Sequence, residues 1–345
     1  MSESTVLDGA VDPRANPVLV GHEAAQSFLA QAYRSGRIHH AVLIEGARGI
    51  GKATLAFRFA NHVLRYPEPH DAPAELAEAH PESTVFRHIA SGASPDLLHL
   101  ERPTDEKTGR VKSAITVDEV RRAGRFFGQT SGTGAWRIVI VDPADDLNRS
   151  AANAILKMLE EPPRRSLFLV LSHAPGRLLP TIRSRCLSLR LSPLTTDEVD
   201  QALQALPAGQ GTSAKERSRA AERSDGSVQQ AVMMLNYGGL DIVDAFEAIM
   251  AGDATSSRLK VHALADTLSA KDRDDLFTFF CDHVSVWLGD RARMAAAAGD
   301  IQAAATDAAL AERIANDVTV AGAYNLDRKQ TVLSLFSCLF AARLP

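Results

Sequence analysis

Cysteine is scarce in this chain, and its scarcity excludes several architectures. The 345 residues include only three cysteines, Cys186, Cys281 and Cys338, which lie far apart in the sequence. Three isolated thiols cannot build a disulfide framework and do not have the paired spacing of a zinc site. We therefore expect buried free thiols in a reducing, cytoplasmic environment.

Long apolar runs and an excess of positive charge are also missing. No stretch approaches 18 consecutive apolar residues, and the first 17 residues have neither the basic start nor the apolar core of a signal peptide. We expect no membrane span and no membrane partner. The formal net charge is -4, with 45% hydrophobic and 23% charged residues. This balance is typical of a folded globular protein without a general basic field, so any contact with DNA has to come from a local patch.

The order of apolar strands and helices predicts an α/β fold in the first half of the chain. After a polar, loosely held arm over residues 1–17, short apolar strands alternate with amphipathic helices over 18–193. Such alternation predicts a parallel sheet with helices on both faces, which is a three-layer domain. Prolines and scattered histidines mark residues 66–95 as an insertion or long connection.

Beyond Pro193 the sequence predicts helices alone. Thr195 or Thr196 is expected to cap the first of them, within a small helical domain over residues 194–240. Residues 241–345 are rich in alanine and leucine at helical spacing, which predicts an all-helical packing domain. This last third of the chain indicates no chemistry by itself.

A glycine-rich segment between an apolar strand and a helix is the sharpest motif. It reads Gly46-Ala47-Arg48-Gly49-Ile50-Gly51-Lys52-Ala53-Thr54 and matches the phosphate-binding pattern G-x-x-x-x-G-K-[ST] except at the last position. The glycines let backbone N–H groups surround phosphate oxygens, while the helix N-terminus and Lys52 add positive charge. The residues expected to contact a nucleotide such as ATP are Gly46, Gly49, Ile50, Gly51, Lys52, Ala53 and Thr54.

The position after Lys52 does not have the hydroxyl that usually ligates Mg²⁺. Ala53 carries no side-chain oxygen, and Thr54 is rotated from it by about 100° around the helix axis. We expect Thr54 to face away from a metal ion. Phosphate binding is expected to survive, because the loop backbone and Lys52 remain, whereas metal positioning is weakened. We assign no metal ligands.

An apolar strand that ends in an acid completes the predicted pocket. The run Ile138-Val139-Ile140-Val141-Asp142 has the form of a Walker B strand, whose acid holds Mg²⁺ through water. Many ATPases have a glutamate next, where this chain has Pro143, which provides neither an acid nor an N–H. Asp145 and Asp146 follow, but nothing in their spacing places them at the site. The other interpretation of Asp142 is a turn residue at a strand end.

A third segment resembles a known family. The run Asn153-Ala154-Ile155-Leu156-Lys157-Met158-Leu159-Glu160-Glu161-Pro162-Pro163, followed by Ser184-Arg185-Cys186, resembles the AAA+ clamp-loader subunits of bacterial DNA polymerase III. Gly21-His22-Glu23 and His39-His40-Ala41 are similar too. The likeness covers about residues 18–240, and the helical remainder fits the family's collar by position and composition. It implies an AAA+ P-loop domain, a helical lid over 194–240 and an oligomerising collar over 241–345.

The resemblance implies a role for Arg185. In the family, the arginine of the Ser-Arg-Cys motif acts in trans, as an arginine finger that reaches the γ-phosphate bound by a neighbouring subunit. A guanidinium there neutralises charge on the transferred phosphoryl group, an effect of roughly 10³–10⁵ in rate in comparable systems. The alternative is a structural or surface role for Arg185, within the arginine-rich stretch 164–190.

Hydrolysing members of the family carry a hydroxyl, an acid and an arginine at three positions where this chain differs. It has Ala53, Pro143 and, in the stretch Gly226-Ser227-Val228-Gln229, a glutamine. With Arg185 retained, the combination resembles the rigid, non-hydrolysing members that donate an arginine to the ATPase beside them. The family's four clustered zinc cysteines are absent from this chain, so no zinc is expected.

The implied function is that of a clamp-loader subunit that binds nucleotide without efficient hydrolysis. Its expected partners are gamma/tau-like ATPase subunits and a delta-like subunit, with the sliding clamp and primer-template DNA contacted through the complex. Three alternatives remain. An active AAA+ motor would use Thr54 or Asp145 for the missing groups; a P-loop small-molecule kinase would have no use for the Ser-Arg-Cys segment; a DNA-binding module would use the arginines of 164–190.

Overall fold

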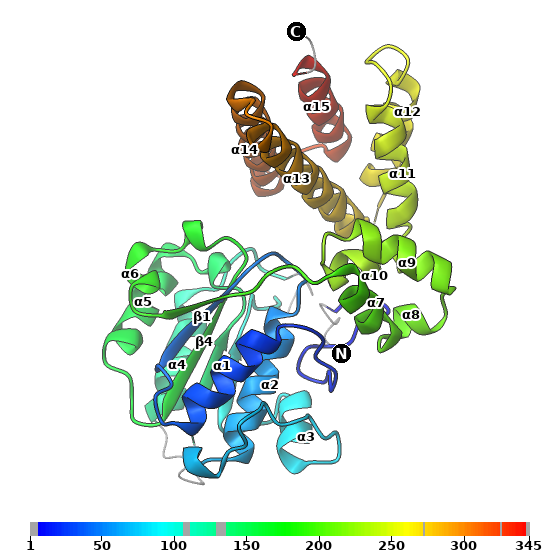
Figure 1. The fold of residues 1–345 in the computed structure, drawn as a ribbon. Helices are drawn as coiled ribbons and strands as arrows, with labels where there is room; N and C mark the ends of the chain where they lie inside the picture. Colours follow the sequence, from blue (N-terminus) through cyan, green and yellow to red (C-terminus); the bar gives the residue numbers. More distant parts are fainter. Residues whose placement is uncertain (1–5, 106–110, 129–135, 272, 325, 343–345) are drawn as a thin grey trace. The chain divides into compact units, whose positions relative to one another are not determined.

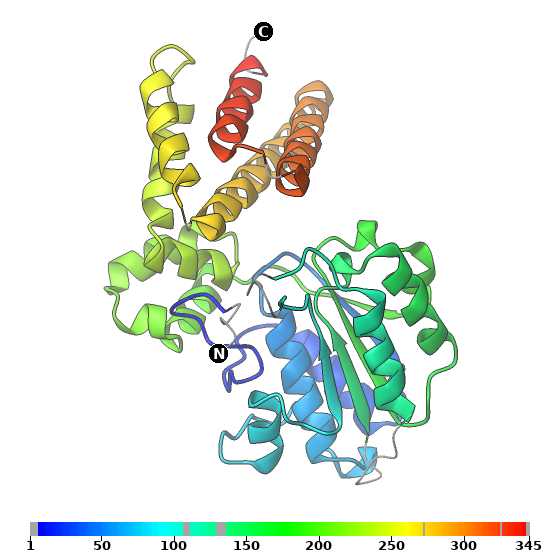
Figure 2. The same cartoon turned by 180° about the vertical axis from the view of Figure 1, so that it is seen from behind.

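The computed structural model describes residues 6–105, 111–128, 136–271, 273–324 and 326–342 (Figure 1; Figure 2 from behind). The chain divides into two compact units, residues 1–232 and 233–345. The first five residues of the predicted arm lie outside the described residues. The predicted domain boundaries at 193 and 240 stay predictions.

A five-stranded parallel sheet forms the centre of the first unit. The strands are β1 (Ala41–Glu45), β2 (Leu97–Leu100), β3 (Arg137–Val141), β4 (Ser166–Ser172) and β5 (Leu187–Arg190). Their order is β2-β3-β4-β1-β5, and every neighbouring pair is parallel. Parallel neighbours require crossover connections, and these connections carry the helices.

Helices cover both faces of the sheet, as Figure 1 shows. They are α1 (Glu23–Arg34), α2 (Lys52–Arg65), α3 (Thr84–Ala90), α4 (Val117–Gly128), α5 (Arg149–Glu160) and α6 (Pro180–Arg183). Successive side chains of a strand point to opposite faces. In β1, Val42 and Ile44 therefore pack in the layer of α1 and α2, whereas Ala41 and Leu43 pack with α4 and α5. The predicted three-layer α/β fold class is confirmed.

Among the described residues only helices follow β5. In the first unit these are α7 (Thr196–Gln204), α8 (Pro207–Gln210), α9 (Ala214–Arg223) and the start of α10 (Val228–Asn236). Thr195 is the N-cap of α7: its hydroxyl accepts from the Glu198 N–H, and the Glu198 carboxylate accepts from the Thr195 N–H. This reciprocal capping box fixes where the helix begins. Of the two threonines expected as cap, Thr195 is correct.

The second unit is all helical in its described residues, which confirms the predicted helical C-terminal region. Its helices are α11 (Gly239–Met250), α12 (Arg258–Ser269), α13 (Asp274–Ala297), α14 (Ile301–Tyr324) and α15 (Arg328–Ala341). Phe246, Phe280 and Phe336 pack their rings together at centroid distances of 5.9 to 6.0 Å. These aromatic contacts join α11, α13 and α15 into one core.

The proline-rich segment 66–95 is anchored to α2. The His62 Nδ1 accepts a hydrogen bond from the Ala77 N–H at 3.1 Å, and the Arg58 guanidinium donates to the Ala77 carbonyl at 3.4 Å. His62 is fully buried, and this burial lowers its pKa to about 4. The segment also contains α3, which the sequence does not predict. The connection is thus an ordered part of the first unit in its described residues.

The burial of His62 predicts a loss of stability in mild acid. Its pKa in the folded chain lies below that of an unfolded histidine, about 6.5. The stabilisation is complete above pH 6.5 and is lost as the pH falls toward 4, by up to about 1.4 kcal/mol per pH unit for one proton. Urea unfolding midpoints between pH 7 and 4.5 measure this slope. The glutamine of His62→Gln does not titrate, so the slope of stability against pH should fall by up to about 1.4 kcal/mol per pH unit, the value for one proton. An unchanged slope would contradict the assignment.

Candidate functional site

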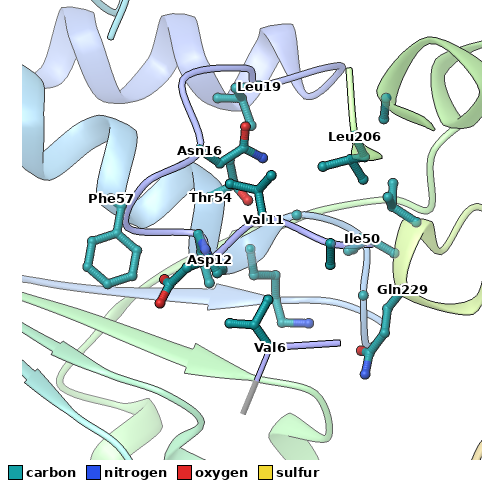
Figure 3. A pocket seen from close by; sticks show the side chains of 18 of the residues that line it. Val6, Val11, Asp12, Asn16, Leu19, Ile50, Thr54, Phe57, Leu206 and Gln229 are labelled. Carbon is teal, nitrogen blue, oxygen red and sulfur yellow. The ribbon is translucent and has the colours of Figure 1, made fainter. Parts of the chain in front are cut away.

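A cavity of about 350 Å³ in the first unit contains most of the predicted nucleotide site (Figure 3). Among its lining residues are Gly49, Ile50, Gly51, Lys52, Ala53, Thr54 and Asp142. Gly46 and Arg185 are predicted site residues that do not line it. The parallel sheet explains the convergence, because the segments that follow β1, β3 and β4 leave the same edge.

The glycine loop between β1 and α2 packs directly against the start of α10. Gly49 has a φ of 77°, and a Cβ there would lie 2.3 Å from the Ser227 Oγ and 2.5 Å from the Gln229 Cβ. Only glycine therefore fits this position. The Gln229 N–H donates to the Gly49 carbonyl at 3.4 Å, and Gln229 lines the cavity. The glutamine that replaces the family's arginine thus stands beside the loop.

Lys52 is hydrogen-bonded through its ammonium group inside the glycine loop between β1 and α2. Its side chain is buried, and its Nζ donates to the carbonyls of Gly46 at 2.8 Å and Ala47 at 2.5 Å. Burial lowers the pKa of Lys52 to about 8, although the nearby carboxylates of Asp142 and Asp145 favour its charged form. The ammonium is thus fixed at the base of the loop and remains mostly charged at neutral pH.

Asp142 follows β3 and faces a histidine from the edge strand. The Asp142 Oδ2 lies 3.6 Å from the Nε2 of His99, and the Nδ1 of the same ring lies 3.7 Å from the Glu101 Oε1. The His99 side chain is 12% exposed, and neither ring nitrogen makes a hydrogen bond within the protein. The imidazole therefore stands between two carboxylates at the wall of the cavity.

The two later acids, Asp145 and Asp146, have other contacts. The Asp145 carboxylate accepts from the Ser172 hydroxyl at 2.8 Å and from the His173 N–H at 2.6 Å, which caps the end of β4. Asp146 pairs with Arg102 at 3.1 Å. Neither acid is among the residues that line the cavity. Asp145 therefore has a structural role: its charge acts on Lys52, but its carboxylate does not line the cavity.

The described part of the N-terminal arm is ordered, where the sequence predicts a loosely held segment. The Gly9 carbonyl accepts from the Ala208 N–H at 2.9 Å, and the Pro17 carbonyl accepts from the Arg58 guanidinium. Val6, Val11 and other arm residues line the cavity, as Figure 3 shows. Apolar residues within an otherwise polar arm are the signal that sequence reasoning missed. They make one wall apolar, which suits a flat organic base.

His99 and His173 are two lining histidines that the sequence analysis did not single out. His173 follows β4, its Nδ1 is buried without a hydrogen-bond partner, and burial lowers its pKa to about 4. The His173 ring is therefore neutral at pH 7. The available sequence signal is the position of each histidine: His99 lies within a short apolar strand, and His173 directly follows one. The pairing of strands far apart in the chain is needed to bring both rings to the same cavity.

Arg185 lies outside the cavity, in the turn between α6 and β5. Its guanidinium pairs with the Glu160 Oε1 at 2.7 Å and donates to the Thr181 carbonyl at 3.0 Å. The side chain is 35% exposed. The neighbouring Cys186 is half-buried, and burial raises its pKa to about 11, so the thiol stays protonated at neutral pH. Arg185 is therefore a surface group in this chain.

The described part of the chain contains neither a metal-ligand cluster nor a membrane-spanning helix. No group of three or more histidine, cysteine, aspartate or glutamate side chains there is placed to hold a metal ion. No helix in the same ranges is long and apolar enough to cross a membrane. The phosphate loop, the fixed Lys52 and the apolar wall fit a nucleotide, whereas the donor set does not fit a tightly held Mg²⁺.

A family model described as "DNA polymerase III, delta subunit" matches residues 21–195. The DNA polymerase III subunit delta' of Pseudomonas aeruginosa is 42% identical over 147 residues, which cover 43% of this chain and 41% of that protein. The subunit tau of Salmonella typhimurium is 29% identical over 255 residues, 72% of this chain and 35% of that protein. These matches span less than half of the relatives' own length.

Among solved structures, a DNA polymerase III gamma subunit-related protein of Thermotoga maritima is 14% identical to this chain with a TM-score of 0.39. The match covers 92% of this chain and 99% of that protein.

The lowered pKa of Lys52 predicts how phosphate binding depends on pH. A bound phosphate favours the charged ammonium, so affinity should be constant below pH 8 and fall above it, up to tenfold per pH unit, until the higher pKa of the bound state is reached. Fluorescence titrations with a labelled nucleotide between pH 6.5 and 10 measure this. Lys52→Ala should bind at least tenfold more weakly at pH 7 and show no decline above pH 8; the same decline in that variant would contradict the role of Lys52.

Proposed function

Because the chain belongs to the DNA polymerase III delta subunit family, we propose that it is a delta-prime-like subunit of a clamp loader. In this role it helps to place the sliding clamp on primed DNA. It binds a nucleotide in a site that is poorly suited to hydrolysis, and it donates Arg185 to an ATPase subunit beside it. The observation that carries the proposal is a pocket with an intact phosphate loop but without the groups that cleave phosphate, in a chain whose motif arginine lies at its surface.

Phosphate retention is supported by the loop and Lys52. α2 begins at Lys52 without a side-chain N-cap, so the first turn of the helix presents its N–H groups and its positive end at the loop, and Lys52 provides a fixed positive charge. The apolar wall that the arm provides would hold the base. The ligand class that we expect is thus ATP or its diphosphate.

Weak or absent hydrolysis is supported by three side chains. Ala53 has no oxygen for the metal, and Pro143 has no carboxylate to orient water. Gln229 lines the cavity where hydrolysing relatives present an arginine. Asp145 cannot replace the missing acid while it caps the end of β4.

A trans role is supported by the surface position of Arg185. Its partner Glu160 is 47% exposed, and an ion pair between such half-exposed groups is worth only about 0–1 kcal/mol. The guanidinium can therefore exchange Glu160 for a neighbour's phosphate at low cost. A planar guanidinium is suited to that task because it binds phosphate oxygens in pairs.

The proposed partners are gamma/tau-like ATPase subunits and a delta-like subunit, with the clamp and primer-template DNA reached through the complex. The match to a tau subunit over 72% of this chain is consistent with a shared architecture. We propose that this assembly acts in the cytoplasm.

Replacement of Arg185 tests the trans role. In the reconstituted complex, Arg185→Ala should slow single-turnover hydrolysis at the neighbouring site by roughly 10³-fold or more, because charge on the transferred phosphoryl group is no longer neutralised. Assembly, followed by size-exclusion chromatography, should be unchanged. Arg183→Ala, which removes an exposed arginine two positions earlier, is the matched control and should hydrolyse normally. Equal rates in both variants would overturn the trans role.

An active motor of the tau or gamma type is the second candidate, favoured by the extent of the tau match. The two candidates differ in the behaviour of the chain alone. We expect the purified chain to show no steady-state ATP hydrolysis above that of Lys52→Ala, since the metal hydroxyl and the acid are absent. Turnover of about 1 s⁻¹ or more, in the usual enzymatic range, would favour the motor instead.

A further inference from the structure

We infer that the P-loop cavity of this chain takes a nucleoside diphosphate without magnesium. This inference rests on the proposed nucleotide binding and specifies its ligand. It begins from the disagreement between the cavity, which retains the groups that hold phosphate, and the residues that would have to hold the metal.

The first missing metal contact is at the start of α2. Mg²⁺ requires oxygen ligands in near-octahedral geometry, of which P-loop proteins supply one from the hydroxyl after the lysine. Ala53 lines the cavity at that position and has only a methyl group. Thr54 is rotated from it by about 100° on the same helix. Thr54 lines the cavity too (Figure 3), but the position that supplies the metal ligand in P-loop proteins has no oxygen in this chain.

The second metal contact is compromised by His99. Its Nε2 lies 3.6 Å from the Asp142 Oδ2, and the ring packs edge-on against Phe57 with centroids 5.2 Å apart. The Asp142 backbone is fixed as well, because its N–H donates to the Leu100 carbonyl at 2.8 Å. A bulky imidazole with buried, unpaired nitrogens thus occupies one side of the carboxylate. A hydrated Mg²⁺ would need the space that the His99 ring occupies and the oxygen lone pairs of Asp142 that the ring faces.

No other described acid near the loop compensates. Asp145 is committed to the Ser172 hydroxyl and to the His173 N–H, and Asp146 to Arg102. Glu101 faces the opposite nitrogen of His99 at 3.7 Å. Asp12 also lines the cavity but pairs with Arg14 at 2.8 Å. Among the described acids, Asp142 is therefore the one that follows the Walker B strand and lines the cavity, and His99 already contacts it.

The groups at the cavity determine whether a diphosphate or a triphosphate binds more tightly. The loop N–H groups and Lys52 serve a β-phosphate without help from a metal. A third phosphate would add negative charge near Asp142, whose field reaches Lys52, without the Mg²⁺ that bridges the β- and γ-phosphates in hydrolysing sites. The cavity therefore favours a diphosphate over a triphosphate, and magnesium adds nothing to the affinity.

Equilibrium binding of a fluorescent ADP to the full chain, with Mg²⁺ or with EDTA, tests the inference. We expect dissociation constants that agree within about threefold, and ATP in EDTA that binds no more tightly than ADP. A gain of tenfold or more on addition of Mg²⁺ would overturn the inference but leave nucleotide binding in place. Failure of both nucleotides to bind would overturn the inference and the proposed nucleotide site together, while the Arg185 experiment would stand.

Restoration of the metal contacts gives the complementary test. The double variant Ala53→Ser, His99→Asn supplies the hydroxyl and frees Asp142, so Mg²⁺ should now tighten ADP binding by tenfold or more. Thr54→Ala is the matched control and should remain insensitive to Mg²⁺. Thermal unfolding monitored by circular dichroism verifies that each variant is folded. A folded double variant that still ignores Mg²⁺ would overturn the assignment of these two residues, and a wild-type response to Mg²⁺ that vanishes in Thr54→Ala would make Thr54 the ligand.

Discussion

Parallel pairing of β1, β3 and β4 is the constraint on which the candidate site depends. It brings the loop after β1, Asp142 after β3 and His173 after β4 to one edge of the sheet, although about 130 residues separate the first from the last along the chain. The alternation of β1 side chains between the two helical layers favours this register, since a shift by one residue would move Val42 and Ile44 from the layer of α1 and α2 into that of α4 and α5. The position of every group at the cavity follows from that packing.

The same edge holds groups with opposite functions. Lys52, fixed by the carbonyls of its own loop, and the N–H groups around it can retain phosphate, while Ala53 and Pro143 leave out what cleavage requires. We propose that Arg185 acts on a neighbouring subunit, because its side chain lies at the surface and does not line the cavity of its own chain. A subunit of this kind would make hydrolysis in the neighbour depend on contact between the two.

The sequence predicted those features that are encoded locally. The strands, the glycine loop and the cap at Thr195 depend on short spacings, and the structure has them where the patterns predicted them. The ordering of the arm, the burial of His62 and the approach of His99 to Asp142 were not predicted. Each depends on contacts between segments far apart in the chain, such as Gly9 with Ala208 or Ala77 with His62, which no local pattern reports. Arg185 was found from its motif, but its pairing with Glu160 required the fold.

In the mechanism that we propose, this chain binds phosphate in its own cavity and donates the Arg185 guanidinium to a neighbouring subunit. An experimental structure of the assembled complex with a non-hydrolysable nucleotide tests it most directly. In that complex we expect the Arg185 guanidinium to have left Glu160 and to lie within hydrogen-bond distance of the terminal phosphate in the adjacent subunit. A guanidinium still paired with Glu160 and remote from every bound nucleotide would contradict it.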